Sequence, residues 1–372
     1  MNYVRMPIEV ESPEERGYAS IRFNLAESSV RDRTIADLGV AWEDLVLAYA
    51  DHRGRPGLLS LIAGRAGAPV TEADVLTTTG AAGALFITAT SLLTASDHLV
   101  VVRPNYATNI ETPRAIGCAI SFLDLAFEDG FVLDPARIVA AIRPNTRLIS
   151  VTTPHNPTGV MLSAETLRDV IAIAEARGVK VLVDETYRDM AFGPQLPVAA
   201  SLSPAAISVS SVSKTYGIPG VRVGWIVCRD PALMTRFLAA KEQIGICGSV
   251  IDERLAEAAL ARGEAWLTPL QARLREGFAT IKAWMAGEPR LEWVEPAGGC
   301  VCFPRVRPDV PVDMEAFYRV LLDDHAAMVG PGHWFEMDRR FMRIGYGWPL
   351  AEELAGGLTA ISASLDAAVK RG

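Results

Sequence analysis

The sequence predicts an α/β protein with a large domain, built on a mostly parallel sheet, and a smaller α+β domain. Short runs rich in β-branched residues alternate with longer segments of helical period, as in parallel strands joined by crossover helices. The 372 residues are enough for two such domains. We expect residues 50–288 to form the large domain, and residues 1–49 and 289–372, from both chain ends, to form the small one.

The same two signals, runs rich in β-branched residues and segments of helical period, predict where the individual elements lie. Strands of the large sheet are expected at 99–103, 120–123, 148–152, 179–184, 207–212 and 225–228. Helices are expected at 83–94, 135–142, 164–177 and 231–240, as several long helices within 250–285, and at 314–323 and 350–369. Residues 292–306 are predicted to form strands with a turn at Gly298-Gly299.

Composition and charge exclude several classes of protein. The net charge is −8, which disfavours nucleic acid or an anionic membrane as a partner. Residues 75–96 carry no charge, but they contain six threonines and two serines, so a buried helix is preferred to a membrane span. Cys300 and Cys302 lack a histidine or second cysteine pair at ligand spacing, so no metal site is expected. We therefore expect a cytoplasmic protein.

Lys214 follows directly on a predicted strand, where α/β proteins place active groups. A lysine there can form a Schiff base with an aldehyde, provided that its surroundings lower its pKa. Ser211 and Arg222 flank it with a hydroxyl and a guanidinium, which both suit a phosphate. The alternative is a surface lysine followed by an unrelated arginine.

Polar side chains also follow two other predicted strands. Asn156, in a sharp turn with prolines and a glycine, can donate a hydrogen bond to a phenolate-like oxygen; a purely structural turn does not require the asparagine. Asp184 ends an apolar strand and needs a partner if buried, and a protonated pyridine nitrogen would be one. Tyr187, three residues later, can reach the same ring.

Two further segments suit a flat, phosphorylated ligand. Ala81 and Ala82, between two glycines, open a predicted helix, and small residues at a helix N-terminus can cradle a phosphate with backbone N–H groups. Tyr106 lies just past a strand and can stack on a flat cofactor or merely pack.

In this order along the chain, these segments resemble the class I/II aminotransferases, the fold-type I pyridoxal-5′-phosphate (PLP) enzymes of the aspartate aminotransferase superfamily. The resemblance extends from about Tyr49 to Arg343. It implies PLP as the cofactor and transfer of the amino group of an L-amino acid to a 2-oxo acid through a Schiff base on Lys214. A PLP lyase, cyclase or oxidase shares these motifs and is the alternative. The non-enzymatic alternative, a ligand-sensing domain of a transcription regulator, is disfavoured by the acidic charge.

The resemblance also implies a role for each residue around the cofactor ring. Lys214 matches the Schiff-base lysine, which also shuttles a proton. Asp184 matches the aspartate that pairs with the ring nitrogen and keeps the ring an electron sink. Asn156 and Tyr187 match the pair that hydrogen-bonds the ring oxygen, and Tyr106 matches the aromatic that stacks on the ring.

The phosphate of the cofactor is assigned in the same way. Ser211, Arg222 and the amides of Ala81 and Ala82 match the family's phosphate cup. Tyr49 is similar to the tyrosine that reaches the phosphate of the neighbouring subunit, which implies a homodimer with shared active sites.

Two residues are candidates for binding the substrate, beside Asn156. Arg343 lies in a segment similar to the strand whose arginine grips the substrate α-carboxylate; the alternative is an arginine on a late strand without this role. Glu27 lies where many family members have a glycine-bearing segment, and its carboxylate would favour a basic or polar substrate side chain; the alternative is a solvated glutamate at a helix start. This stretch also resembles PLP enzymes that act on arginine derivatives, such as capreomycidine synthase.

Overall fold

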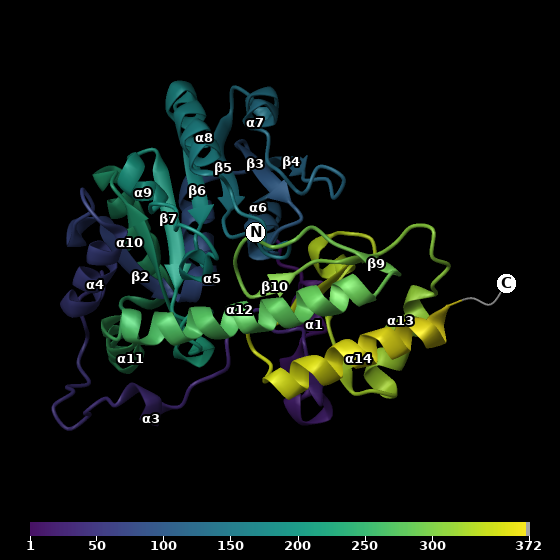
Figure 1. The fold of residues 1–372 in the computed structure, drawn as a ribbon. Coiled ribbons are helices and arrows are strands. Elements are labelled where there is room, and N and C mark those ends of the chain that lie inside the picture. The colour runs from purple at the N-terminus through teal and green to yellow at the C-terminus, as the bar shows by residue number, and fades with distance from the viewer. Residues whose placement is uncertain (370–372) are drawn as a thin grey trace.

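The computed structural model describes residues 1–369, in which a seven-stranded sheet forms the centre of the large domain (Figure 1). Its strand order is β2-β8-β7-β6-β5-β3-β4, and β8 alone runs antiparallel to its neighbours. The strands are β2 (Val75–Thr79), β3 (His98–Arg103), β4 (Ala119–Asp124), β5 (Thr146–Thr152), β6 (Lys180–Asp184), β7 (Ala206–Ser211) and β8 (Val223–Cys228). All were predicted except β2, whose run of threonines lacks the apolar pattern of a strand.

Helices cover both faces of this sheet. One face packs on a helix layer that shares its core with the strands, made of α5 (Gly80–Leu92), α6 (Thr108–Ile116) and α10 (Pro231–Gly245). The other face is covered by α4 (Pro56–Ala66), α7 (Pro135–Ala141), α8 (Ala164–Arg177), α9 (Ala199–Leu202) and α11 (Val250–Ala261). The sequence did not predict α4, which contains two glycines, or α6, which contains a proline.

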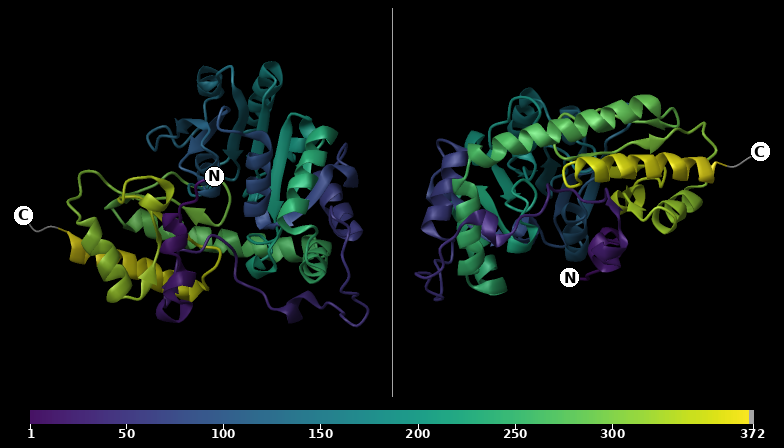
Figure 2. Two further views of the ribbon diagram at one scale, coloured as in Figure 1. Left: turned by 180° about the vertical axis from the view of Figure 1, so that it is seen from behind. Right: turned by 60° about the horizontal axis from the view of Figure 1, so that its bottom comes forward.

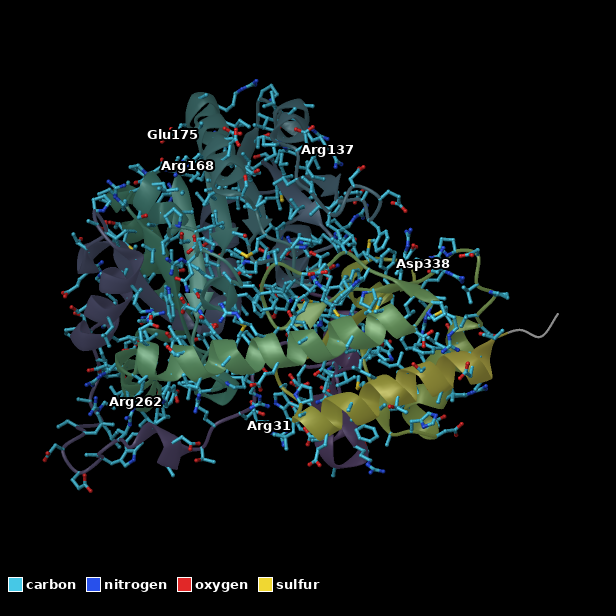
Figure 3. All side chains as sticks on the ribbon, viewed as in Figure 1. Arg31, Arg137, Arg168, Glu175, Arg262 and Asp338 are labelled. Atoms are coloured by element: carbon cyan, nitrogen blue, oxygen red, sulfur yellow. The ribbon has the colours of Figure 1, made fainter. Side chains whose placement is uncertain are left out.

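Helix α8 illustrates how local sequence fixes these elements. Ser163 caps its first turn by accepting a hydrogen bond from a backbone N–H, and Gly178 ends it in the left-handed conformation. Val170 is buried against the sheet, whereas Arg168 and Glu175 lie on the exposed side (Figure 3). The helical period of apolar residues therefore sets which side faces the core.

The small domain joins the two ends of the chain. Strand β1 (Phe23–Asn24) pairs in parallel with β12 (Ala327–Met328), so residues from the N-terminal region and from the C-terminal region share one sheet. The other short strands are β9 (Leu291–Glu292), β10 (Val301–Cys302), β11 (Arg305–Val306), β13 (Gly330–Pro331) and β14 (Met342–Gly345). They form the sheets β10-β14-β13 and β11-β9.

The helices of the small domain were largely predicted. They are α13 (Met314–Asp323), which begins and ends as expected, and α14 (Ala351–Ala368). The 24-residue helix α12 (Glu264–Gly287) runs from beneath the large sheet to the small domain (Figures 1 and 2). The N-terminal segment holds α1 (Pro7–Val10) and α2 (Pro13–Arg16), and α3 (Ile35–Leu38) lies on the extended stretch that follows.

The apolar stretch before residue 97 divides into β2 and α5, so the buried helix begins at Gly80, earlier than predicted. Within residues 1–369, no helix combines the length and the apolar character needed to cross a membrane. Cys300 and Cys302 are both buried. The described part of the chain contains no group of three or more His, Cys, Asp or Glu side chains that could hold a metal ion.

Candidate active site

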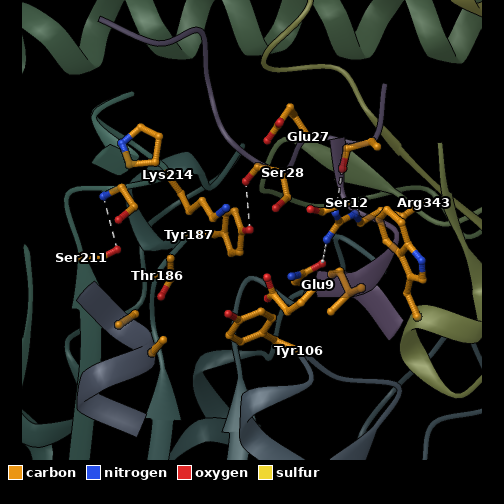
Figure 4. A pocket seen from close by; sticks show the side chains of 18 of the residues that line it. Glu9, Ser12, Glu27, Ser28, Tyr106, Thr186, Tyr187, Ser211, Lys214 and Arg343 are labelled. Carbon is orange, nitrogen blue, oxygen red and sulfur yellow. Dashed lines mark hydrogen bonds between the residues drawn. The ribbon is translucent and has the colours of Figure 1, made fainter. Parts of the chain in front are cut away.

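The loops that leave four parallel strands meet at one edge of the large sheet. They carry Tyr106 after β3, Asn156 after β5, Asp184 at the end of β6 and Lys214 after β7. All four line one cavity of about 180 Å³ (Figure 4). Because the carboxyl ends of parallel strands share an edge, residues distant in sequence converge here, as the sequence predicted.

The amine of Lys214 lies within this cavity. Its Nζ makes no hydrogen bond or ion pair with any of the described residues. Burial lowers the pKa of Lys214, and the nearby Glu27 carboxylate opposes part of this shift. A lowered pKa increases the fraction of free amine, which is the form that attacks an aldehyde.

Asp184 is a buried carboxylate that has no salt bridge within residues 1–369. Thr186 donates both its backbone N–H and its hydroxyl to Asp184 Oδ1, at 3.1 and 2.6 Å. Burial raises the pKa of Asp184, because the ionised form has lost water without gaining a cation. A protonated ring nitrogen in the cavity would supply that cation.

The N-terminus of α5 provides an anion cradle at the cavity wall. Thr79, which precedes the helix, makes no side-chain cap, and the residues of the first turn, Ala81 and Ala82, line the cavity. A Cβ atom on Gly224 would lie 2.6 Å from the backbone nitrogen of Ala81, so only glycine allows β8 to approach the helix this closely. Uncapped N–H groups at such a terminus favour a phosphate.

Two hydroxyls and a guanidinium complete this end of the cavity. Arg222 lies beside the start of α5, since a Cβ on Gly80 would be 2.6 Å from Arg222 Nη2. Ser211 accepts a hydrogen bond from the backbone N–H of Ser213 at 3.3 Å, and both serines line the cavity. Ser211 and Arg222 were predicted for a phosphate; Ser213 was not, although it directly precedes the lysine.

Arg343, on β14, is 3% exposed and lines the opposite part of the cavity. Its Nη1 donates to Asn156 Oδ1 at 3.0 Å and its Nη2 to the Ala26 carbonyl at 2.7 Å, whereas its Nε has no partner in the described chain. Burial lowers the pKa of Arg343. Because the Asn156 oxygen accepts from Arg343, the Asn156 amide N–H groups are left to donate to a ligand.

The two tyrosines that were predicted to contact the cofactor ring, Tyr106 and Tyr187, both line the cavity. Tyr106 lies at the N-terminal end of α6, on the wall below Lys214 in Figure 4. The Tyr187 hydroxyl donates to the Ser28 carbonyl at 2.9 Å. To hydrogen-bond a ring oxygen, as predicted, this hydroxyl would have to turn away from Ser28.

Glu27 also lines the cavity and is not a solvated residue at a helix start. Its Oε1 accepts hydrogen bonds from the Tyr18 hydroxyl at 3.0 Å and from Asn24 Nδ2 at 3.4 Å. Burial raises the pKa of Glu27, and the charge of Lys214 opposes this shift. Tyr49, in contrast, is 82% exposed and lies outside the cavity. Within a single copy of the chain, it is therefore not near the other predicted site residues.

Several cavity residues were not predicted. Helix α1 contributes Glu9, the N-cap of α2 contributes Ser12, and α2 itself contributes Glu14. The segment before β14 contributes Trp334. Sequence reasoning had no signal for them, because only long-range packing brings residues 7–16 over the strand ends. Glu11, for example, accepts a hydrogen bond from Trp334 Nε1 at 2.8 Å.

A mostly parallel sheet that presents a free lysine amine, a buried carboxylate and an anion cradle at one edge has the architecture of the fold-type I PLP enzymes. The chain matches the family Aminotransferase class I and II over residues 40–356. It therefore belongs to the class I and II aminotransferase family, as its sequence predicted.

Individual relatives are similar over most of their length. Capreomycidine synthase of Streptomyces vinaceus is 30% identical over 293 residues, which cover 78% of this chain and 74% of that protein. Arginine–pyruvate transaminase AruH of Pseudomonas aeruginosa is 31% identical over 301 residues, 77% of this chain and 74% of that protein. The solved structure of a PLP-dependent aminotransferase of Streptococcus suis matches with a TM-score of 0.90 and 28% identity over all of both chains.

Proposed function

We propose that this protein is a PLP-dependent aminotransferase that moves the amino group of an L-amino acid to a 2-oxo acid. The observation that carries the proposal is the Lys214 amine, which has no hydrogen bond within the described chain and a pKa lowered by burial. It shares its cavity with a carboxylate that lacks a cation and with an anion cradle. The family and the aminotransferases among its relatives support this function.

The residues present fit PLP. Asp184 would pair with the ring nitrogen, and Tyr106, Asn156 and Tyr187 would contact the ring and its oxygen. The phosphate would be held by the N–H groups of Ala81 and Ala82 and by the side chains of Ser211 and Arg222. When bound, the cofactor supplies an electron sink for the bonds at the substrate α-carbon.

The chain itself would position the substrate and move its proton. Arg343 would bind the α-carboxylate through its planar guanidinium, with Asn156 beside it. Lys214 Nζ, with its lowered pKa, would accept the proton from the substrate α-carbon and return it on the cofactor side of the substrate nitrogen.

Spectra of the half-reaction test the proposal. On mixing the holoenzyme with L-amino acids, we expect the absorbance of the aldehyde cofactor to convert stoichiometrically to that of pyridoxamine phosphate, and to return when a 2-oxo acid is added. A cyclase is the second candidate, supported by the 30% identity to capreomycidine synthase. In that case the aldehyde absorbance would return without a 2-oxo acid, and the aminotransferase proposal would be contradicted.

We also infer that two copies of the chain form a dimer in which Tyr49 contacts the cofactor phosphate of the other subunit. The segment that contains Tyr49 lies beside the end of α10, because His52 Nδ1 is 2.7 Å from Glu242 Oε1. Large apolar side chains are exposed just before Tyr49 and from the end of α10 to the start of α11, namely Val46, Leu47, Ile244, Ile246 and Ile251. A second copy covering them would bury this apolar surface.

Replacing Tyr49 with phenylalanine is expected to weaken PLP binding about tenfold, because one hydrogen bond to a charged phosphate is lost. Titration of the apoprotein with PLP measures the change, and Tyr3→Phe, at another exposed tyrosine, is the control. Light scattering should give twice the mass of the chain. A monomer that binds PLP with unchanged affinity in both variants would contradict the shared site.

The domain boundaries at residues 49 and 288 and the cytoplasmic location stay predictions from the sequence.

A further inference from the structure

Three glutamates line the cavity without a cationic partner. Glu9, Glu14 and Glu27 all border it, and none of them forms a salt bridge within residues 1–369. The cations of the same cavity have other roles in the proposed function: Lys214 at the reacting carbon and Arg343 at the α-carboxylate, as well as Arg222 at the phosphate. A substrate bound there would therefore meet carboxylates that no salt bridge of the described chain pairs, although the charges of Lys214 and Arg343 act on Glu27.

Glu14 and Glu27 lie close together, since both affect the pKa of the same tyrosine, Tyr18. The Tyr18 hydroxyl donates to Glu27 Oε1 at 3.0 Å, and the charges of Glu27 and Glu14 add to burial in raising the pKa of Tyr18. Glu14 also adds to burial in raising the pKa of Glu27, as expected for two carboxylates that lie close together. Glu9 differs, because its charge acts on Tyr106, where it adds to burial in raising the pKa of that tyrosine.

The N-terminal segment is fixed over the cavity by contacts that do not involve these glutamates. Glu11 Oε2 accepts a hydrogen bond from Trp334 Nε1 and lies 2.8 Å from His333 Nε2. Ser12 caps α2 by accepting a bond from the N–H of Glu15. Glu14 is thereby presented to the cavity by a segment that is anchored to the small domain.

The position of Arg343 determines which part of a bound substrate lies near Glu14 and Glu27. Arg343 is buried, its Nε is unpartnered in the described chain, and its Nη2 donates to the carbonyl of Ala26, the residue before Glu27. An amino acid whose α-carboxylate binds Arg343 and whose α-carbon faces Lys214 is thus held beside Glu27. No further Lys or Arg lines the cavity in the described chain, so a distal carboxylate would find only like charge.

We propose that Glu14 and Glu27 form a side-chain subsite that selects L-amino acids whose side chain ends in a guanidinium or ammonium group. This inference rests on the proposed function, which places the α-carboxylate at Arg343. A cation that leaves water must be paired, and two carboxylates held by Tyr18 and by α2 offer charge-assisted hydrogen bonds without further rearrangement. The subsite deepens the aminotransferase proposal by naming its substrate class.

L-Arginine and L-citrulline provide the matched pair for the test, because they have the same shape and differ in the charge of the terminal group. With the holoenzyme, we expect kcat/KM for arginine to exceed that for citrulline by about 100-fold. Lysine should likewise exceed norleucine, and glutamate should be a poor donor. Equal values for arginine and citrulline would overturn the subsite.

Single substitutions identify which residues cause the preference for a cationic side chain. Glu27→Gln should lower the arginine-to-citrulline ratio about tenfold, and Glu14→Gln severalfold, because Glu14 is the more exposed of the two. Glutamine keeps the acceptor for Tyr18, so folding should be preserved. Glu15→Gln is the control: it is adjacent to Glu14, pairs with Arg5 on the surface and does not line the cavity. An unchanged ratio in both Glu14→Gln and Glu27→Gln would contradict the assignment.

Binding without turnover separates this inference from the proposed function. 5-Guanidinopentanoate keeps the carboxylate and the guanidinium of arginine but has no amino group to transfer, and 5-ureidopentanoate is its uncharged analogue. Calorimetry on the holoenzyme should show tighter binding of the guanidino compound, and Glu27→Gln should remove the difference. Transamination of neutral amino acids without this preference would overturn the subsite alone, whereas preferential binding without any transamination would overturn the aminotransferase proposal alone.

Discussion

Replacing Lys214 with alanine is expected to abolish covalent attachment of PLP and to lower turnover by at least about 10³-fold. The lysine has two roles in the proposed function, because its amine both holds the cofactor aldehyde and moves the substrate proton. Alanine removes the amine without leaving an unsatisfied partner, since Nζ makes no hydrogen bond in the described chain. The variant should therefore fold like the parent protein.

Mass spectrometry after borohydride reduction measures attachment directly. The parent protein should gain the mass of one reduced cofactor on the peptide that contains Lys214, and the Lys214→Ala protein should gain none. Lys282→Ala is a matched control, because Lys282 is exposed on α12 and pairs with Glu295. PLP should still bind Lys214→Ala reversibly through Asp184 and the phosphate cradle. Cofactor fixed by borohydride in Lys214→Ala would contradict the central assignment.

The strand ends of the active site could be predicted because their signals are local. An apolar run that stops at Asp184, or at the residues just before Lys214, identifies both a strand and the edge at which it ends. Parallel pairing then brings these ends together without further information. Strand β2 was not predicted, because its threonines look polar in the sequence. In the structure Thr77 is buried, and its hydroxyl is hydrogen-bonded to Glu253 and Lys241.

The part of the cavity that we propose for the substrate could be predicted only in part. Arg343 and Glu27 were proposed through resemblance and both line the cavity, but Glu14 was not proposed, because its place depends on contacts of α1 and α2 with the distant segment around Trp334. No periodicity encodes such tertiary contacts. Tyr49 illustrates another limit: its proposed partner lies in a second copy of the chain, so its role cannot follow from the fold of one.

Replacing Arg343 with alanine is expected to raise KM for the amino acid about 100-fold, because a buried bidentate partner of the α-carboxylate is lost. The same change leaves Asn156 Oδ1 and the Ala26 carbonyl without their donor, which also costs stability. Arg343→Lys separates the two effects. It keeps a cation in the site but not the planar fork, so KM should be intermediate while the fold is better preserved.

The decisive comparison uses a substrate without the carboxylate. The parent enzyme should prefer an amino acid over the corresponding amine by about 100-fold in kcat/KM, and Arg343→Ala should remove most of that preference by acting on the amino acid alone. A general loss of structure would instead lower both values together. If KM for the amino acid were unchanged in Arg343→Ala, the arginine would have only a structural role between Asn156 and Ala26, and the α-carboxylate would have to bind elsewhere in the cavity.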